Sequence, residues 1–200
     1  MSPRFRHSYL RAFLACAVVV LGLPGVASAQ APSTGGSVYV PPPPPAKRAK
    51  IVDGMAVPPV GAPSRVKRAV AAANLIIRKP YVYGGGHKPY PRRGLAMMSA
   101  NLDRGYDCSG TVSFALFGGR FLASPLDSGS FMSWARPGTG RWITVYTNPG
   151  HAYMVIGGLR LDTSGGDRLA PEERRSGRGP RWRKYRRSPA GFTARHPQGY

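Results

Sequence analysis

Apolar residues recur at helical spacing in two stretches of the chain. The first stretch begins at Ser64, a suitable N-cap, and stops before Pro80, which predicts an amphipathic helix. The second begins behind Asp107, also a suitable N-cap, and ends at a pair of glycines. We therefore expect Cys108 to lie in the first turn of a second helix. The apolar positions of the two stretches are Val66, Val70, Ala73, Ile77, Val112, Ala115, Leu116 and Phe117.

After the second helix the apolar pattern becomes that of β-strands. Short apolar stretches occupy residues 142–146, 151–156 and 159–162, and a weaker one occupies 190–194. Helices followed by a strand meander predict an α+β domain. This domain would extend from residue 64 to residue 200, which is long enough to bury one hydrophobic core.

Residues 1–29 have the pattern of an export signal. Arg4, Arg6 and Arg11 give a cationic start, an apolar run of 12 residues follows, and Ala27-Ser28-Ala29 forms an A-x-A cleavage site. The run is shorter than the ~20 residues that span a membrane. We therefore predict cleavage after residue 29, and no membrane span in the mature chain. Lipidation of Cys16 is a weaker alternative, because this cysteine lies inside the apolar run.

Residues 30–63 are poor in large apolar side chains and contain five consecutive prolines at 41–45. Proline runs favour an extended polyproline spacer, so we predict a disordered proline-rich linker. A ligand for a proline-reading domain is the alternative, but it suits an intracellular signalling protein better. Residues 88–106, rich in Pro, Arg and Gly, are predicted to form a loop inside the domain.

The chain is strongly basic, with 29 Lys and Arg against 8 acids and a formal net charge of +21. Residues 168–200 form a basic C-terminal segment with ten cations and two acids, and Trp182 and Tyr185 are interleaved with the cations. Inside a cell this would indicate nucleic acid. For an exported chain we expect peptidoglycan or another anionic envelope polymer as the partner, and no nucleic acid. A solvated basic surface without a dedicated partner is the alternative.

Cleavage of the export signal would leave Cys108 as the only thiol of the mature chain. A thiol attacks a carbonyl carbon as its thiolate, which a helix N-terminus favours. The small neighbours Ser109 and Gly110 would leave the sulfur approachable, and amides of the first turn could stabilise an oxyanion. The alternative is a buried structural cysteine.

A nucleophilic cysteine needs a base, and His151 is well placed because it begins the apolar strand 151–156. If Gly157 and Gly158 form a two-residue hairpin turn, residue 156 pairs with 159, and Asp162 lies diagonal to His151 on the same face. A carboxylate there would fix the imidazole tautomer and complete a Cys-His-Asp relay. The alternative is that Asp162 only caps the following turn.

Other candidate groups are weaker. His87 could touch a substrate, but an exposed loop histidine is the simpler interpretation. His196 is expected to pack or to hydrogen-bond near the end of the chain. Ser109 lacks the Gly-x-Ser-x-Gly elbow of serine hydrolases, and the histidines lack metal-ligand spacing. We therefore predict no serine nucleophile, no metal and no cofactor.

Three sequence elements resemble, in order and spacing, those of the NlpC-type cell-wall cysteine peptidases, a papain-like group. The resemblance implies N-terminal helices, with the nucleophile helix packed on a small antiparallel sheet. It also implies Cys108 as nucleophile, His151 as base and Asp162 as the third relay residue, where the family more often has His, Asn or Gln. The elements are Pro80-Tyr81-Val82-Tyr83-Gly84-Gly85, then Asp107-Cys108-Ser109-Gly110, then His151 and its strand.

The same resemblance implies a set of substrate-contacting residues. Tyr81 falls where the family has a tyrosine that lines the active site, and Tyr83 replaces the more usual Trp. Asp107 and Ser109, on either side of the nucleophile, complete the predicted substrate-binding set. The family typically hydrolyses amide bonds next to D-amino acids in peptidoglycan stem peptides, and it requires no metal.

These observations predict a secreted or cell-envelope cysteine hydrolase that cleaves amide bonds in peptidoglycan stem peptides. The alternative is a catalytically silent module of the same fold, which binds an envelope polymer through its aromatic and basic residues. Only the hydrolase would release new amines from the wall and lose that activity when Cys108 is alkylated.

Overall fold

The structure is a computed structural model that describes residues 48–90, 95–164, 179–184 and 187–200. The predicted export signal, with Cys16, and most of the predicted linker lie outside these residues, as do parts of the basic C-terminal segment. None of the helices in the described ranges combines the length and the apolar character that crossing a bilayer requires.

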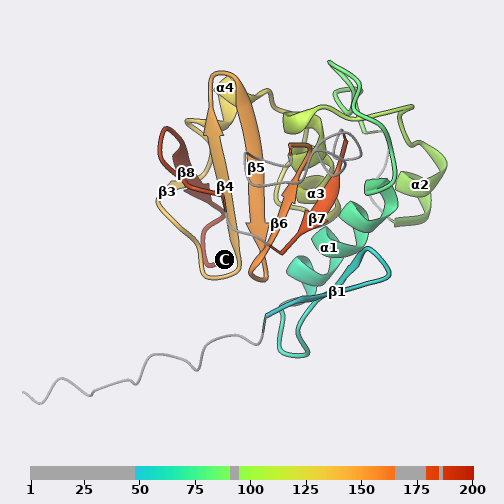
Figure 1. The fold of residues 1–200 in the computed structure, drawn as a ribbon, viewed down its shortest axis with the longest axis horizontal. Coiled ribbons are helices and arrows are strands. Elements are labelled where there is room, and N and C mark those ends of the chain that lie inside the picture. The colour runs from blue at the N-terminus through green and yellow to red at the C-terminus, as the bar shows by residue number, and fades with distance from the viewer. Residues whose placement is uncertain (1–47, 91–94, 165–178, 185–186) are drawn as a thin grey trace, which may run out of the picture. The chain divides into compact units, whose positions relative to one another are not determined.

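An antiparallel sheet forms the centre of the domain. Its strands are β3 (Arg136–Pro137), β4 (Ile143–Asn148), β5 (His151–Ile156), β6 (Leu159–Asp162), β7 (Arg181–Arg183) and β8 (Thr193–His196). Their order across the sheet is β3-β8-β4-β5-β6-β7, and each neighbouring pair is antiparallel (Figure 1). Neighbouring strands therefore run in opposite directions, both where they follow each other in sequence, as β4 and β5 do, and where they are distant in sequence, as β4 and β8 are.

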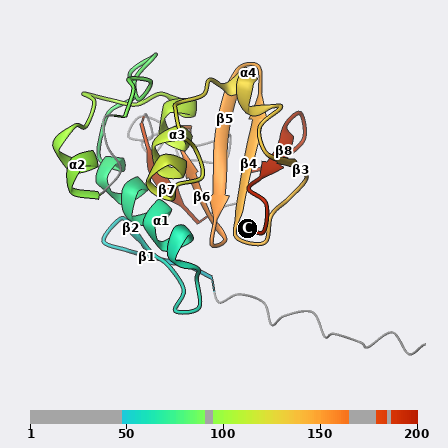
Figure 2. The same cartoon turned by 180° about the vertical axis from the view of Figure 1, so that it is seen from behind.

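Two helices, α1 (Ser64–Ile76) and α3 (Cys108–Gly118), cover one face of this sheet (Figure 2). They approach closely because Gly118 lies against α1, where an added Cβ would come within 2.3 Å of the Ala72 Cβ. Nearly every side chain of α3 is buried, which explains why it is apolar on all sides. The core between helices and sheet includes Val66, Val70, Ala73, Val112, Ala115, Leu116, Val145, Met154 and Leu161.

The predicted α+β class is confirmed, and the central elements lie where the apolar pattern placed them. Strands β5 and β6 have the predicted bounds, and β4 ends two residues later than predicted. The last strand is displaced from the predicted 190–194, because Gly191 has a positive φ of 77° and forms a turn. The Gly191 carbonyl accepts a hydrogen bond from Asn148 Nδ2 at 3.1 Å, so the chain pairs with β4 only after this turn.

Residues 48–63 do not belong to a linker, which corrects the predicted start of the domain. They form a hairpin of β1 (Lys50–Val52) and β2 (Met55–Val57). The hairpin is tied to α1 by Asn74, whose side chain accepts from the Ala56 amide and donates to the Ala56 carbonyl, both at 3.0 Å. The buried side chains here are three alanines and Pro59, so the sequence showed no apolar pattern that would predict packing.

The predicted loop 88–106 contains a short helix, α2 (Leu95–Ala100). Its Met98 is buried beside Ala72 and Phe117, so the segment packs on the helical layer. A further short helix, α4 (Ser128–Phe131), follows α3, and its Asp127 N-cap accepts from the Ser130 amide at 2.8 Å. Both helices are too short to produce a clear helical period in the sequence.

Part of the basic C-terminal segment is a strand of the sheet. In β7 the Trp182 side chain is buried and its indole Nε1 donates to Asn74 Oδ1 at 2.7 Å, while Arg181 and Arg183 are half-buried on either side. The Arg181 guanidinium donates to the carbonyls of Ile77 and Lys79 at the end of α1. Burial lowers the pKa of Arg181. These arginines are therefore structural, as well as contributing to the positive charge.

Candidate active site

Cys108 is the first residue of α3, and Asp107 is its N-cap. The Asp107 Oδ1 accepts from the Gly110 amide at 2.7 Å, and the Asp107 carbonyl accepts from the Thr111 amide at 3.0 Å. The side chain of Cys108 is partly exposed and is a free thiol. The predicted position of the thiol in the first turn of a helix is therefore the observed one.

The glycine-rich turn packs directly on this helix start. Gly84 donates its amide to Asp107 Oδ2 at 3.0 Å, and the Asp107 amide donates to the Gly85 carbonyl at 3.1 Å. A Cβ added at Gly110 would lie 2.1 Å from the Gly85 carbonyl oxygen, so a larger residue does not fit there. The glycines in the two motifs thus allow their backbones to touch.

His151 reaches the site from the other side, at the start of β5. The Asn148 Oδ1 accepts from the amides of Gly150 and His151, which fixes the turn between β4 and β5. The imidazole packs edge-on against the Phe192 ring, with centroids 6.3 Å apart. Its side chain is only 18% exposed, so its orientation is set by the fold.

Asp162 is hydrogen-bonded to His151, with Nε2 and Oδ1 2.9 Å apart. The β5–β6 register is the one predicted from the glycine pair, with Ile156 opposite Leu159. Oδ1 also accepts from the Ser164 amide at 2.8 Å, and the carboxylate is fully buried. Since Nε2 is bonded to the carboxylate, Nδ1 is the ring nitrogen available to the thiol.

The thiol and the imidazole shift each other's pKa in opposite directions. Burial raises the pKa of Cys108, but hydrogen bonds from the His151 side chain and the Ala152 amide, together with the imidazolium charge, lower it by more. Burial lowers the pKa of His151, but hydrogen bonds to Asp162 and Cys108 and their negative charges raise it to about 9. The arrangement favours a thiolate beside an imidazolium, the form in which a cysteine acts as nucleophile.

Two arginines that the sequence analysis did not single out face the other carboxylate oxygen. Arg160 Nε lies 3.4 Å and an Arg187 guanidinium nitrogen 3.5 Å from Asp162 Oδ2. Arg160 had a detectable signal, because it lies two residues before Asp162 and so on the same face of β6. Arg187 had none, since no pattern relates it to β6.

His87 was underestimated by the sequence analysis, which treated it as an exposed loop residue. Its Nε2 lies 3.0 Å from Asp107 Oδ1 and 3.2 Å from Ser109 Oγ. The side chain is only 26% exposed. The hydrogen bond to Asp107 raises the pKa of His87, although burial opposes this. His87 therefore belongs to the packing of the helix start.

The predicted substrate-binding residues differ in their positions. Tyr81 is 40% exposed. Burial raises its pKa, and the negative charges of Cys108 and Asp107 raise it further, which places its hydroxyl within electrostatic range of the thiol. Tyr83 is 90% exposed and so lies at the outer surface. Ser109 is buried, and its hydroxyl donates to Asp107 Oδ1 at 3.2 Å. Tyr81 is thus the member of this set that is both accessible and close to Cys108.

His196 Nδ1 lies 3.0 Å from the Gly138 carbonyl, a contact between β8 and the turn after β3. Among the residues that the structure describes, no group of three His, Cys, Asp or Glu side chains is arranged to hold a metal ion.

A thiol, an imidazole and a buried carboxylate in series form the arrangement that supports nucleophilic catalysis by cysteine. No family model matches the chain, and no curated protein matches it. Several solved structures do match the chain. The peptidoglycan hydrolase RipB of Mycobacterium tuberculosis is 25% identical with a TM-score of 0.48, and the match covers 72% of this chain and 70% of RipB.

Two further solved structures match at lower identity. The hypothetical invasion protein Rv1477 of Mycobacterium tuberculosis is 18% identical, and the resuscitation promoting factor interacting protein RipA is 19% identical. Each has a TM-score of 0.42, and each match covers 74% of this chain and 70% of the other. All three TM-scores lie below 0.5.

Proposed function

We propose that this chain is an exported cysteine hydrolase that cleaves amide bonds in the stem peptides of peptidoglycan. The observations that support this most strongly are the hydrogen bond between His151 and the buried Asp162 and the mutual pKa shifts that link His151 to Cys108. These residues come from α3, β5 and β6, and they meet at the start of α3. A buried structural cysteine would need neither a histidine partner nor a carboxylate behind that histidine.

The first chemical step would form an acyl-enzyme. The Cys108 thiolate, its proton held on His151 Nδ1, attacks the amide carbonyl carbon. The first N–H groups of a helix have no intrahelical partner, and Asp107 occupies that of Gly110. The amides of Cys108 and Ser109 would then stabilise the oxyanion. The C–N bond breaks as His151 gives its proton to the leaving amine, which leaves a thioester on Cys108.

The second step would release the product. A water molecule gives a proton to His151 and attacks the thioester carbonyl, and the C–S bond breaks. The product leaves as a carboxylic acid, which then loses its proton to solvent, and the thiolate and imidazolium form again. Asp162 takes no proton in either step, because its role is to hold the ring with Nδ1 toward the sulfur and to stabilise the imidazolium charge.

The motifs around Tyr81 and Cys108, and the charge, support the proposed substrate class. The motifs resemble those of a family that acts on stem peptides. The excess of cations would attract the chain to an anionic envelope, and this attraction would weaken as the salt concentration rises. Export is proposed from the pattern of residues 1–29.

The test is digestion of purified peptidoglycan by the full chain, with new amino groups counted and fragments identified by mass. The Cys108→Ala chain should release none, because the thioester cannot form. The Cys16→Ala chain is the matched control, since it loses the other cysteine, and it should digest at the normal rate.

Two outcomes would remove the hydrolase proposal. Digestion that persists in the Cys108→Ala chain would assign the chemistry to other residues. Binding to peptidoglycan without any release of amines, in the unsubstituted and the Cys16→Ala chains alike, would favour the silent binding module.

A further inference from the structure

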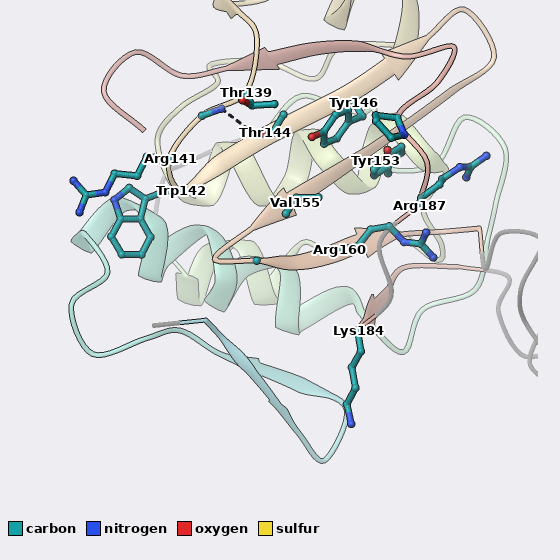
Figure 3. Close-up of a pocket in the computed structure, with 13 residues that line it drawn as sticks. Thr139, Arg141, Trp142, Thr144, Tyr146, Tyr153, Val155, Arg160, Lys184 and Arg187 are labelled. Atoms are coloured by element: carbon teal, nitrogen blue, oxygen red, sulfur yellow. Dashed lines mark hydrogen bonds between the residues drawn. The ribbon is translucent and has the colours of Figure 1, made fainter. Parts of the chain in front are cut away.

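A cavity lies on the face of the sheet opposite α1 and α3. Side chains alternate between the two faces of a strand. Val145 and Met154 point into the core, so Tyr146 and Tyr153 point to the other face, where they stack with centroids 5.0 Å apart. A cavity of about 410 Å³ opens over them, and Figure 3 shows its lining side chains in front of the strands with the helices behind.

The lining of this cavity carries only positive charge among the described residues. Four cations contribute to it from four different segments, and no described acidic side chain does. Three aromatic rings also line the cavity: Trp142 lies beside the cations, and the two stacked tyrosines lie at its floor. The four cations are Arg141, Arg160, Lys184 and Arg187.

The Arg187 guanidinium is held in place before any ligand arrives. It lies over the Phe192 ring at 5.1 Å and the Tyr153 ring at 5.6 Å from the centroids. Among the residues that the structure describes, it faces the Asp162 carboxylate, at 3.5 Å, which Arg160 also faces. The Asp162 carboxylate is therefore shared by two guanidinium groups of the cavity lining.

Two polar atoms at this end are buried without a hydrogen-bond partner among the described residues. They are the hydroxyl of Tyr153 and Arg187 Nη1, the same nitrogen that forms the 3.5 Å ion pair with Asp162 Oδ2. Buried polar groups are nearly always hydrogen-bonded, because an unsatisfied one costs about 1–3 kcal/mol. Both residues line the cavity, so an acceptor placed there would satisfy a guanidinium N–H and the tyrosine O–H together.

We infer that this cavity is a binding site for a small organic anion, a phosphate or carboxylate group carried on a body the size of one sugar ring. Arginine presents paired N–H donors that match the oxygens of such groups. The volume falls within the 300–1,000 Å³ typical of small-molecule sites. The aromatic lining would pack on the uncharged body of the ligand.

This site is separate from the proposed catalytic chemistry but is linked to it through two shared arginines. Arg160 and Arg187 line the cavity and also face Asp162, which is bonded to His151. An anion bound there would change the electrostatic environment of the His151 ring without touching it. Binding itself requires no turnover, so it can be measured whether or not the chain is a hydrolase.

The experiment titrates the full chain with inorganic phosphate, glucose 1-phosphate, glucuronate and neutral glucose, and follows heat by calorimetry and the His151 ring by NMR. The three anions should bind saturably at one site, with the sugar anions tighter than phosphate, and glucose should not bind. The His151 resonance should shift with the same saturation as the heat.

Substitutions at the rim test the location. Arg141 and Lys184 are exposed and lie outside the contacts with Asp162. Arg141→Gln and Lys184→Gln should each weaken binding about twofold to fivefold, as expected for exposed charge pairs, and more when combined. Lys67→Gln on α1 is the matched control, because it removes the same charge from the opposite face, and it should leave binding unchanged.

Three results would overturn the inference. If Lys67→Gln weakened anion binding as much as the rim substitutions do, the loss of affinity would be due to the net charge of the chain and not to this cavity. If neutral glucose bound as tightly as glucose 1-phosphate, the cations of the cavity would not be recognising an anionic group. The absence of saturable binding of all three anions would show that the cavity takes no such ligand. Binding of inorganic phosphate as tight as that of the sugar anions would show that the assignment of a sugar-sized body to the ligand is wrong.

Discussion

Two histidine–aspartate pairs lie on either side of the helix that carries Cys108, and they differ in what the carboxylate does. The two pairs are almost identical in length, with 2.9 Å from His151 to Asp162 and 3.0 Å from His87 to Asp107. Asp107 also accepts from the amides of Gly84 and Gly110, so its oxygens are engaged by the backbone. Asp162 engages one backbone amide and two arginines.

The difference teaches that a histidine paired with a carboxylate is not thereby a base. The His151 ring is linked on its other side to the thiol, and both partners raise its pKa, to about 9. The His87 ring is linked to Asp107 and to Ser109, both of which hold the helix start together. In the proposed mechanism one pair moves a proton to and from the thiol, whereas the other fixes the geometry around it.

The largest expected effect separates the two histidines by the same substitution. His151→Ala should lower the rate of peptidoglycan digestion about 10²–10⁴-fold, as the loss of a general base does. His87→Ala should change it by less than about tenfold, because it perturbs position rather than proton transfer. The measurement is the initial rate of amine release by each chain under identical conditions. Equal losses in both would erase the distinction between the pairs.

Asp162→Asn should have the next largest effect, since it keeps the size and one oxygen but removes the charge behind the imidazole. We expect the rate to fall about tenfold to 10³-fold, with circular dichroism confirming that the chain is folded. Asp107→Asn is the matched substitution in the other pair. It should reduce the rate far less, because an amide oxygen still caps the helix. A greater loss from Asp107→Asn would reverse the assignment.

The pH dependence of digestion should identify the same pair. The rate should rise as the Cys108 thiol, whose pKa is lowered, loses its proton, and fall through the His151 pKa of about 9 as the imidazolium that protonates the leaving amine disappears. Asp162 raises the pKa of His151, so Asp162→Asn should move the alkaline limb to lower pH. His87→Ala should leave that limb in place, and an equal shift there would contradict the account.

The smallest effect is one on stability. Asp107→Ala removes the acceptor of the Gly110 amide at the start of α3 and of the Gly84 amide in the glycine-rich turn, so it should lower the free energy of unfolding by about 1 kcal/mol or somewhat more. Urea unfolding curves of Asp107→Ala and Asp107→Asn measure this directly. The asparagine variant should recover most of the loss. If both variants were as stable as the unsubstituted chain, the capping role of Asp107 would be wrong.

The sequence predicted the parts of the molecule that depend on local rules. Asp107 is a cap of the preferred type, and a two-glycine turn after Ile156 fixes the register of β5 and β6 by strand parity alone. The closeness of His151 and Asp162 follows from that register. These features needed no knowledge of how distant segments pack.

The parts that were missed depend on long-range contacts. The hairpin of residues 50–57 is held by Asn74, and β7 is held by the buried Trp182. Each therefore depends on one long-range contact, and neither shows a repeating hydrophobic pattern in the sequence. Arg187 reaches Asp162 from a different part of the chain, and His87 reaches Asp107 across a glycine turn. A polar side chain that finds its partner across the fold leaves no local pattern in the sequence.

The most direct test of the central claim, that His151 ionises Cys108, is the pH dependence of iodoacetamide labelling in the Cys16→Ala chain, where Cys108 is the only thiol. We predict labelling at pH values well below the ~8.5 of an ordinary thiol, and a shift of the profile toward that value in the same chain with His151→Ala. A profile that already matches an ordinary thiol, or one that His151→Ala leaves unchanged, would contradict the account.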